Sequence, residues 1–171
     1  IMPYSMVNTN SLSFDGDNDY VDPQALFADV TNTFTISLWA RPGAEHQIDD
    51  ETTAGVAGSE GQKYAVWPVH GGDAYGSGHA AVGLSIGING ISVYEHSNGY
   101  MPPLLVHEAT LDDWTHVAVV YTNKSPKLYL DGELVRTGLT SFKTVHPSAG
   151  RGDIHAGQLG GFGGGTYGYY G

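Results

Sequence analysis

Short segments in which apolar and polar residues alternate recur along this chain, and a period of two residues is typical of half-buried β-strands. In residues 34–41 (Phe-Thr-Ile-Ser-Leu-Trp-Ala-Arg) the apolar residues other than tryptophan share one face, and Pro42-Gly43 ends the run. Residues 114–122 alternate in the same way around Val117, Val119 and Tyr121. Five further segments are predicted to contain strands: 63–69, 82–88, 91–96, 127–130 and 133–136.

Two of the predicted strand pairs are separated by strong turn signals. Asn89-Gly90 and Asp131-Gly132 both favour the positive φ angles of two-residue hairpin turns. No segment shows a convincing helical period, and the best helical candidate, 23–27, is long enough for one turn. The pattern predicts an all-β fold: a two-sheet antiparallel jelly-roll sandwich that forms one domain over residues 1–171.

Charge and composition exclude several kinds of partner. The formal net charge is −11, from 7 basic and 18 acidic residues, so phosphate backbones and anionic lipid surfaces are repelled. We therefore expect no nucleic acid partner. No apolar run approaches the roughly 18 residues of a membrane-spanning helix, so we expect no membrane insertion. The chain has no cysteine, which excludes disulfides and thiolate metal sites.

An acidic turn near the start of the chain is a candidate metal site. Asp15, Asp17 and Asp19 fall within five residues around Gly16, between a short predicted strand and a second one. Calcium prefers carboxylate and carbonyl oxygens on a flexible loop, so these four residues are the predicted Ca²⁺ ligands. The alternative is a tight turn that is rich in Asp and Asn because such residues favour turns. A second acidic cluster, 49–51, is a weaker candidate.

Four segments carry a resemblance to a known family. They are Leu12–Val21 (Leu-Ser-Phe-Asp-Gly-Asp-Asn-Asp-Tyr-Val), Phe34–Pro42 (Phe-Thr-Ile-Ser-Leu-Trp-Ala-Arg-Pro), Asp113–Tyr121 (Asp-Trp-Thr-His-Val-Ala-Val-Val-Tyr) and Lys127–Val135 (Lys-Leu-Tyr-Leu-Asp-Gly-Glu-Leu-Val). In this order and spacing they resemble laminin G-like domains of the concanavalin A-like lectin/glucanase superfamily. The resemblance implies a jelly roll, and it favours a structural calcium near the first strand.

The end of the chain departs from that family pattern. Residues 148–171 are rich in glycine, and 166–171 (Thr-Tyr-Gly-Tyr-Tyr-Gly) look like the lead-in to a closing strand that does not follow. A missing strand leaves an exposed sheet edge. The resemblance therefore implies either that a neighbouring subunit or chain supplies the closing strand, as in strand donation, or that the sequence was cut before that strand.

Aromatic and planar polar residues between 67 and 100 form the candidate ligand site. Sugars are held by aromatic faces against their C–H surfaces and by polar side chains that bond their hydroxyls. The alternative is that Trp67 and Tyr94 belong to the core and the others fill loops. The predicted ligand-binding residues are Trp67, His70, Asp73, Tyr75, His79, Tyr94, Asn98 and Tyr100.

Catalysis is not expected. A glycosidase needs two carboxylates across a cleft, and the acidic residues Glu95, Glu108 and Glu133 each stand alone on their predicted strands. We expect a non-catalytic, extracellular or surface recognition module that binds a glycan or other surface ligand. One alternative is a structural subunit of a surface filament, adhesin or phage virion. A second alternative is a glycoside hydrolase-like sandwich.

Overall fold

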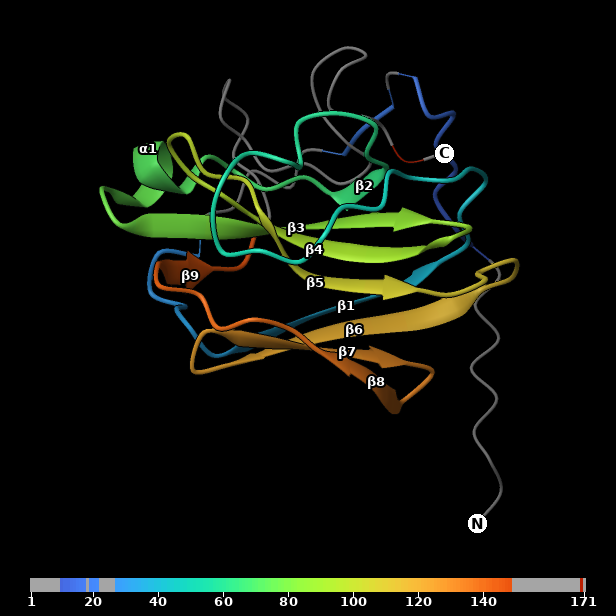
Figure 1. The fold of residues 1–171 in the computed structure, drawn as a ribbon. Coiled ribbons are helices and arrows are strands. Elements are labelled where there is room, and N and C mark those ends of the chain that lie inside the picture. The colour runs from blue at the N-terminus through green and yellow to red at the C-terminus, as the bar shows by residue number, and fades with distance from the viewer. Residues whose placement is uncertain (1–9, 18, 22–26, 149–169, 171) are drawn as a thin grey trace.

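The computed structural model describes residues 10–17, 19–21, 27–148 and 170. Two sheets lie face to face with the hydrophobic core between them (Figure 1). This arrangement confirms the predicted all-β sandwich. The strands are β1 (Phe34–Ala40), β2 (Tyr64–Val66), β3 (His79–Gly87), β4 (Gly90–His96), β5 (Pro103–Glu108), β6 (Thr115–Thr122), β7 (Ser125–Leu130), β8 (Glu133–Thr137) and β9 (Thr144–His146), with one short helix, α1 (Gly71–Tyr75).

The four-stranded sheet follows the alternation of its sequence closely. Its strand order is β1-β6-β7-β8, with antiparallel neighbours throughout. Val117, Val119 and Tyr121 of β6 face the core, and the ring of Phe34 on β1 stacks on Tyr121 with 4.9 Å between centroids. The residues between them point to the outer face, because successive side chains of a strand alternate between faces.

The five-stranded sheet is more deeply buried. Its order is β2-β3-β4-β5, and β9 pairs with β3 in parallel, a departure from the antiparallel pairing expected throughout. Almost every residue of β3 and β4 is buried, on both faces. The inner face packs in the core, and the outer face contacts residues 43–63, which we call the covering segment. No helix in the described part of the chain is long and apolar enough to span a membrane.

Polar contacts hold the covering segment against the five-stranded sheet. Asp49 Oδ2 accepts hydrogen bonds from the Tyr94 hydroxyl at 2.7 Å and from Gln62 Nε2 at 3.1 Å. The side chain of Asn89 bonds the backbone of His46 twice, accepting from its amide at 3.0 Å and donating to its carbonyl at 2.9 Å. The segment is therefore packed structure and not the solvated loop that its polar composition indicates.

Glu51 ties the covering segment to the edges of both sheets. Its carboxylate forms a two-point ion pair with Arg136 of β8, at 2.7 and 2.9 Å, and also accepts from the amide of Val106 on β5 at 2.9 Å. Burial raises the pKa of Glu51, but Arg136 and the amide outweigh burial and hold it below its ordinary value. The second acidic cluster therefore has structural partners.

One of the two predicted hairpin turns is confirmed, and the other is shifted by one residue. Asp131 and Gly132 adopt positive φ angles of 50° and 89° between β7 and β8, which confirms that turn. Gly87 pairs with Gly90, so the other turn consists of Ile88 and Asn89, one residue earlier than predicted.

Two local predictions differ from the structure. The described residues of 11–21 form no strand beyond a single bridge position at Val21, so the predicted strands flanking the acidic turn are not observed there. Helix α1 lies in the glycine-rich loop 69–79, where no helix was predicted. Most of the helical candidate 23–27 and most of the glycine-rich segment 148–171 lie outside the described residues, so strand donation stays a prediction.

A buried carboxylate links the two sheets near one end of the sandwich. Glu95 of β4 is fully buried and accepts hydrogen bonds from the hydroxyls of Tyr121 on β6 at 3.1 Å, Tyr100 at 3.2 Å and Ser141 at 2.5 Å. Burial raises its pKa from 4.5 to about 7, against the opposing effect of the three hydroxyls and of Lys124.

This shift predicts a pH-dependent stability. A carboxyl group whose pKa is raised on folding stabilises the fold fully below its unfolded pKa, near 4.5, and loses that contribution as pH rises through about 7. Glu95→Gln keeps the shape and removes the charge. We expect its stability relative to wild type to improve by about 3 kcal/mol between pH 4 and pH 8.

Urea unfolding of both proteins across this pH range measures the difference. His46 and His146 have pKa values lowered by burial, so they act in the opposite direction in both proteins and cancel in the comparison. Parallel pH profiles for the two proteins would show that Glu95 does not titrate in this range.

Candidate functional site

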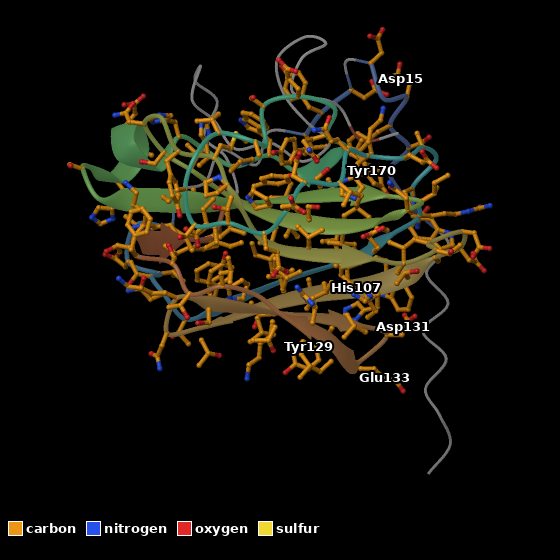
Figure 2. The ribbon with its side chains drawn as sticks, viewed as in Figure 1. Asp15, His107, Tyr129, Asp131, Glu133 and Tyr170 are labelled. Atoms are coloured by element: carbon orange, nitrogen blue, oxygen red, sulfur yellow. The ribbon has the colours of Figure 1, made fainter. Side chains whose placement is uncertain are left out.

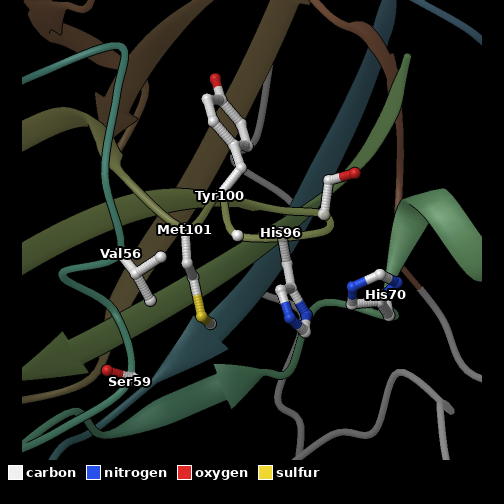
Figure 3. A pocket seen from close by; sticks show the side chains of 8 residues that line it. Val56, Ser59, His70, His96, Tyr100 and Met101 are labelled. Atoms are coloured by element: carbon white, nitrogen blue, oxygen red, sulfur yellow. The ribbon is translucent and has the colours of Figure 1, made fainter. Parts of the chain in front are cut away.

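A pocket of about 130 Å³ opens where the turn between β4 and β5 meets the start of α1 (Figure 3). Three segments far apart in the sequence form it: residues 56–59 of the covering segment, His70 before α1, and residues 96–101. The lining residues are Val56, Ser59, His70, His96, Ser97, Gly99, Tyr100 and Met101.

Two histidine rings stand at one side of this pocket. The rings of His70 and His96 lie 4.8 Å apart between centroids at 83°, and His96 also meets the ring of Trp67 edge to face at 5.6 Å. His96 Nδ1 lies 3.1 Å from the carbonyl oxygen of Pro68. A carbonyl only accepts, so Nδ1 carries the proton, and this bond fixes both the tautomer and the orientation of the ring.

His70 also shapes the start of α1. Its Nδ1 lies 3.2 Å from the amide nitrogen of Asp73 and 3.2 Å from the carboxylate Oδ2 of the same residue. The neutral ring caps the helix by accepting from the amide, whereas the protonated ring donates to the carboxylate. His70 is therefore held at the pocket by the helix that it caps.

The helix and the β4–β5 turn approach each other at Gly72. A Cβ atom at this position would lie 3.1 Å from Ser97 Oγ and 3.3 Å from Asn98 Nδ2. Asp73 and Asn98 are both exposed, so they lie at the rim of the pocket rather than inside it. Glycine at position 72 lets the two segments close the pocket on this side.

Of the eight predicted ligand residues, four gather here: His70, Asp73, Asn98 and Tyr100. Tyr100 contributes little of its ring, because Figure 3 shows that its side chain points away from the two histidines. Its hydroxyl reaches Glu95, and its ring packs against Phe142 with 5.3 Å between centroids.

Trp67 and Tyr94 are buried instead of exposed to a ligand. They form a small aromatic cluster with Tyr64 and Met101 on the outer face of the five-stranded sheet, under the covering segment. Tyr64 packs edge to face on both, with 5.0 and 5.8 Å between centroids. Because both rings are shielded from solvent, they support the pocket and do not offer a sugar a stacking face.

Tyr75 and His79 belong to a separate cluster around His146 of β9. The ring of Tyr75 stacks on His146 at 3.8 Å and 10°, and His79 Nδ1 lies 2.8 Å from His146 Nε2. His146 Nδ1 faces the carbonyl of Phe27 at 3.2 Å, so neutral His146 accepts from His79 at Nε2. Burial, and to a lesser extent His79, lowers the pKa of His146. These contacts attach β9 to β3.

The sequence did not single out His96 or Ser59 as site residues. His96 ends an alternating strand shortly before the Asn98-Gly99 turn. A polar ring beside a tight turn is the sequence signal that could have marked it as a site residue. Ser59 has no such signal, because the polar composition of the covering segment indicates a solvated loop.

The acidic turn lies on the side of the five-stranded sheet, away from Tyr129 on the other sheet (Figure 2). Asp15 Oδ1 accepts from the amide of Asp17 at 2.9 Å, and Asp19 Oδ2 accepts from the amide of Asp15 at 3.2 Å. Within the described residues, no group of three or more acidic or histidine side chains is arranged to hold a metal ion. The geometry found here is that of an Asp-rich turn, and its Ca²⁺ ligands, with Gly16 among them, stay a prediction.

The family model for laminin G-like domains, described as the concanavalin A-like lectin/glucanase superfamily, matches residues 15–168. No curated protein is significantly similar to the chain. The matched range spans both sheets and the pocket. The chain therefore belongs to the concanavalin A-like lectin/glucanase superfamily, as a laminin G-like domain.

Proposed function

We propose that this domain is a non-catalytic recognition module that binds the end of a glycan in the pocket beside α1. The observation that carries the proposal is the pair of crossed histidine rings in an open pocket, with Asp73 and Asn98 at its rim. Rings offer faces to sugar C–H groups, and the planar polar groups suit sugar hydroxyls. A concave site with a few placed polar groups is the usual form of a small-ligand site.

Size and charge narrow the class of glycan. At about 130 Å³ the pocket is smaller than the roughly 300–1,000 Å³ of sites for drug-sized ligands, so it suits one terminal sugar residue. The net charge of −11 disfavours sulfated, sialylated or uronic acid ligands. We therefore propose a neutral terminal sugar, presented at an extracellular, cell or virion surface.

The contacts of two carboxylates, Glu95 and Glu51, favour binding over hydrolysis. Glu95 is sealed among three hydroxyls, and Glu51 is paired with Arg136. A glycosidase needs an acid and a base that both reach the substrate, and neither Glu95 nor Glu51 is free to act as the second carboxylate beside Asp73 at the rim. Turnover of a polysaccharide by the purified domain would instead support the glycoside hydrolase-like alternative.

His70→Ser tests the pocket. Serine is a good helix N-cap, so the variant keeps α1 while it removes the imidazole. We expect affinity for the best glycan of a neutral-sugar array to fall about tenfold, the effect of one hydrogen bond and its buried contact. Isothermal titration calorimetry measures the change.

His116→Ser is the matched control, because His116 lies on the outer face of the opposite sheet, beside Trp39. Its affinity should equal that of wild type. Equal losses in both variants, or no glycan bound by wild type, would contradict the proposal.

We also propose that the acidic turn binds calcium weakly. Asp15 and Asp19 both accept hydrogen bonds from backbone amides of the turn, which holds both carboxylates within the same short turn. Extracellular calcium modules have dissociation constants of about 10⁻⁴–10⁻³ M. At ten times the dissociation constant, binding stabilises the fold by about 1.4 kcal/mol, so we expect the midpoint of thermal unfolding to rise by about 3–6 °C.

Calorimetry with and without calcium, followed by excess EDTA, measures this rise and its reversal. Asp17→Asn should abolish the rise, whereas Asp131→Asn, in the turn between β7 and β8, should keep it. An unchanged midpoint for wild type in calcium would remove this part of the proposal.

A structural or adhesive subunit is the second candidate function, favoured by the outer face of the four-stranded sheet. Trp39 is 59% exposed there, and Leu134 is 53% exposed. Tyr129 of β7 pairs with Leu134 in the register and points outward in Figure 2, and Trp39 lies at the opposite edge of the same sheet, on β1. Exposed apolar side chains on one sheet face are typical of contact surfaces.

Sedimentation analysis over a range of concentrations tests this second candidate. We expect wild type to self-associate reversibly and Trp39→Ser to stay monomeric, because the substitution removes the largest apolar surface of this face. Glu133→Gln is a control on the neighbouring hairpin that leaves the apolar side chains intact. A wild-type protein that is monomeric at every concentration would argue against a subunit that assembles with its own copies.

A further inference from the structure

The chain contains two Asn-Gly pairs, Asn89-Gly90 and Asn98-Gly99, and the structure holds them very differently. In such a pair the backbone nitrogen of glycine can attack the side-chain carbonyl carbon of asparagine. A C–N bond forms, ammonia leaves, and water then opens the cyclic imide to aspartate or isoaspartate. We propose that Asn98 is a site of spontaneous deamidation, which places a second carboxylate beside Asp73 at the rim of the pocket.

Asn98 lies where the reaction is least hindered. It is exposed in the two-residue turn between Ser97 and Tyr100, which bond each other through their amides and carbonyls at 2.8 and 3.1 Å. Gly99 has a φ of 57°, and no atom lies within 4 Å of the position of a Cβ there. An exposed turn tip without a side chain at its second position lets the glycine nitrogen approach the asparagine side chain.

Asn89 is restrained by the structure. Its side chain is engaged at both ends by the backbone of His46, at 3.0 and 2.9 Å. Gly90 packs so closely on β5 that a Cβ there would overlap the carbonyl oxygen of His107. Cyclisation at Asn89 would break both hydrogen bonds and move Gly90 away from β5. The same dipeptide therefore serves as an internal control.

Conversion at position 98 would change the pocket in two ways. The new carboxylate would stand close to Gly72, the residue before Asp73, which raises the negative charge at the rim. Isoaspartate would also lengthen the backbone by one carbon within the turn, whose next residues, Gly99 and Tyr100, line the pocket. This consequence rests on the proposed glycan binding, whereas the conversion itself does not.

Peptide mapping by mass spectrometry tests the conversion. Freshly purified folded protein is held in mildly alkaline buffer, and the exchange of nitrogen for oxygen is followed at both asparagines. We expect Asn98 to convert about tenfold faster than Asn89, or more, because Asn89 must first lose two hydrogen bonds. In urea-unfolded protein the two sites should convert at similar rates. Equal rates in the folded protein would overturn the proposal.

Glycan affinity provides the second readout. Asn98→Asp should lower affinity below that of fresh wild type, whereas Asn98→Gln, which keeps an amide but cyclises far less readily, should lose no further affinity on ageing. If Asn98→Asp bound as well as wild type, the link to the pocket would be overturned and the conversion would stand. If fresh wild type bound no glycan, the proposed function would fail, and the mass measurements would still decide the modification.

Discussion

The covering of the five-stranded sheet by residues 43–63 is the constraint on which the other features depend. These residues shield a sheet face that would otherwise be open to solvent. Polar groups that become buried there must be hydrogen-bonded. Asp49 accepts a hydrogen bond from the hydroxyl of Tyr94, and the side chain of Asn89 forms two hydrogen bonds with the backbone of His46. Because this face is closed, the candidate pocket lies instead at the sheet end, where the covering segment, α1 and the β4–β5 turn meet.

The alternation of the sequence was enough to predict most of the strands, the sandwich and the turn at Asp131-Gly132. It was not enough for the candidate site. Trp67 and Tyr94 were candidates because aromatic rings suit sugars, with a place in the core as the alternative. The structure confirms that alternative. An antiparallel sheet commonly has one solvated face, and a polar, acidic segment gives no sign that it will cover that face. The residues that cover these two side chains lie tens of positions away in the sequence. The resemblance to laminin G-like domains supplied the family and not the ligand.

The alternation of β4 indicates that Glu95 faces the core, although in the sequence it stands out only as an isolated acidic residue on its strand. Glu95 follows Ile91 and Val93 in the alternation of β4, so the strand directs it inward. The three hydroxyls that bond it come from different parts of the chain, and only the folded structure brings them together. A carboxyl group in that setting links β4 to β6 through the hydroxyl of Tyr121, at a cost in desolvation that depends on pH.

The placement of the three tryptophans gives the domain built-in optical reporters. Trp67 lies in the aromatic cluster behind the pocket, in edge contact with His96, whereas Trp39 and Trp114 are largely exposed, at 59% and 45%. A soluble quencher should therefore reach the emission of the two outer indoles and spare the inner one. Changes at the pocket and contacts on the outer sheet face would then appear as separate fluorescence signals from a single unlabelled protein.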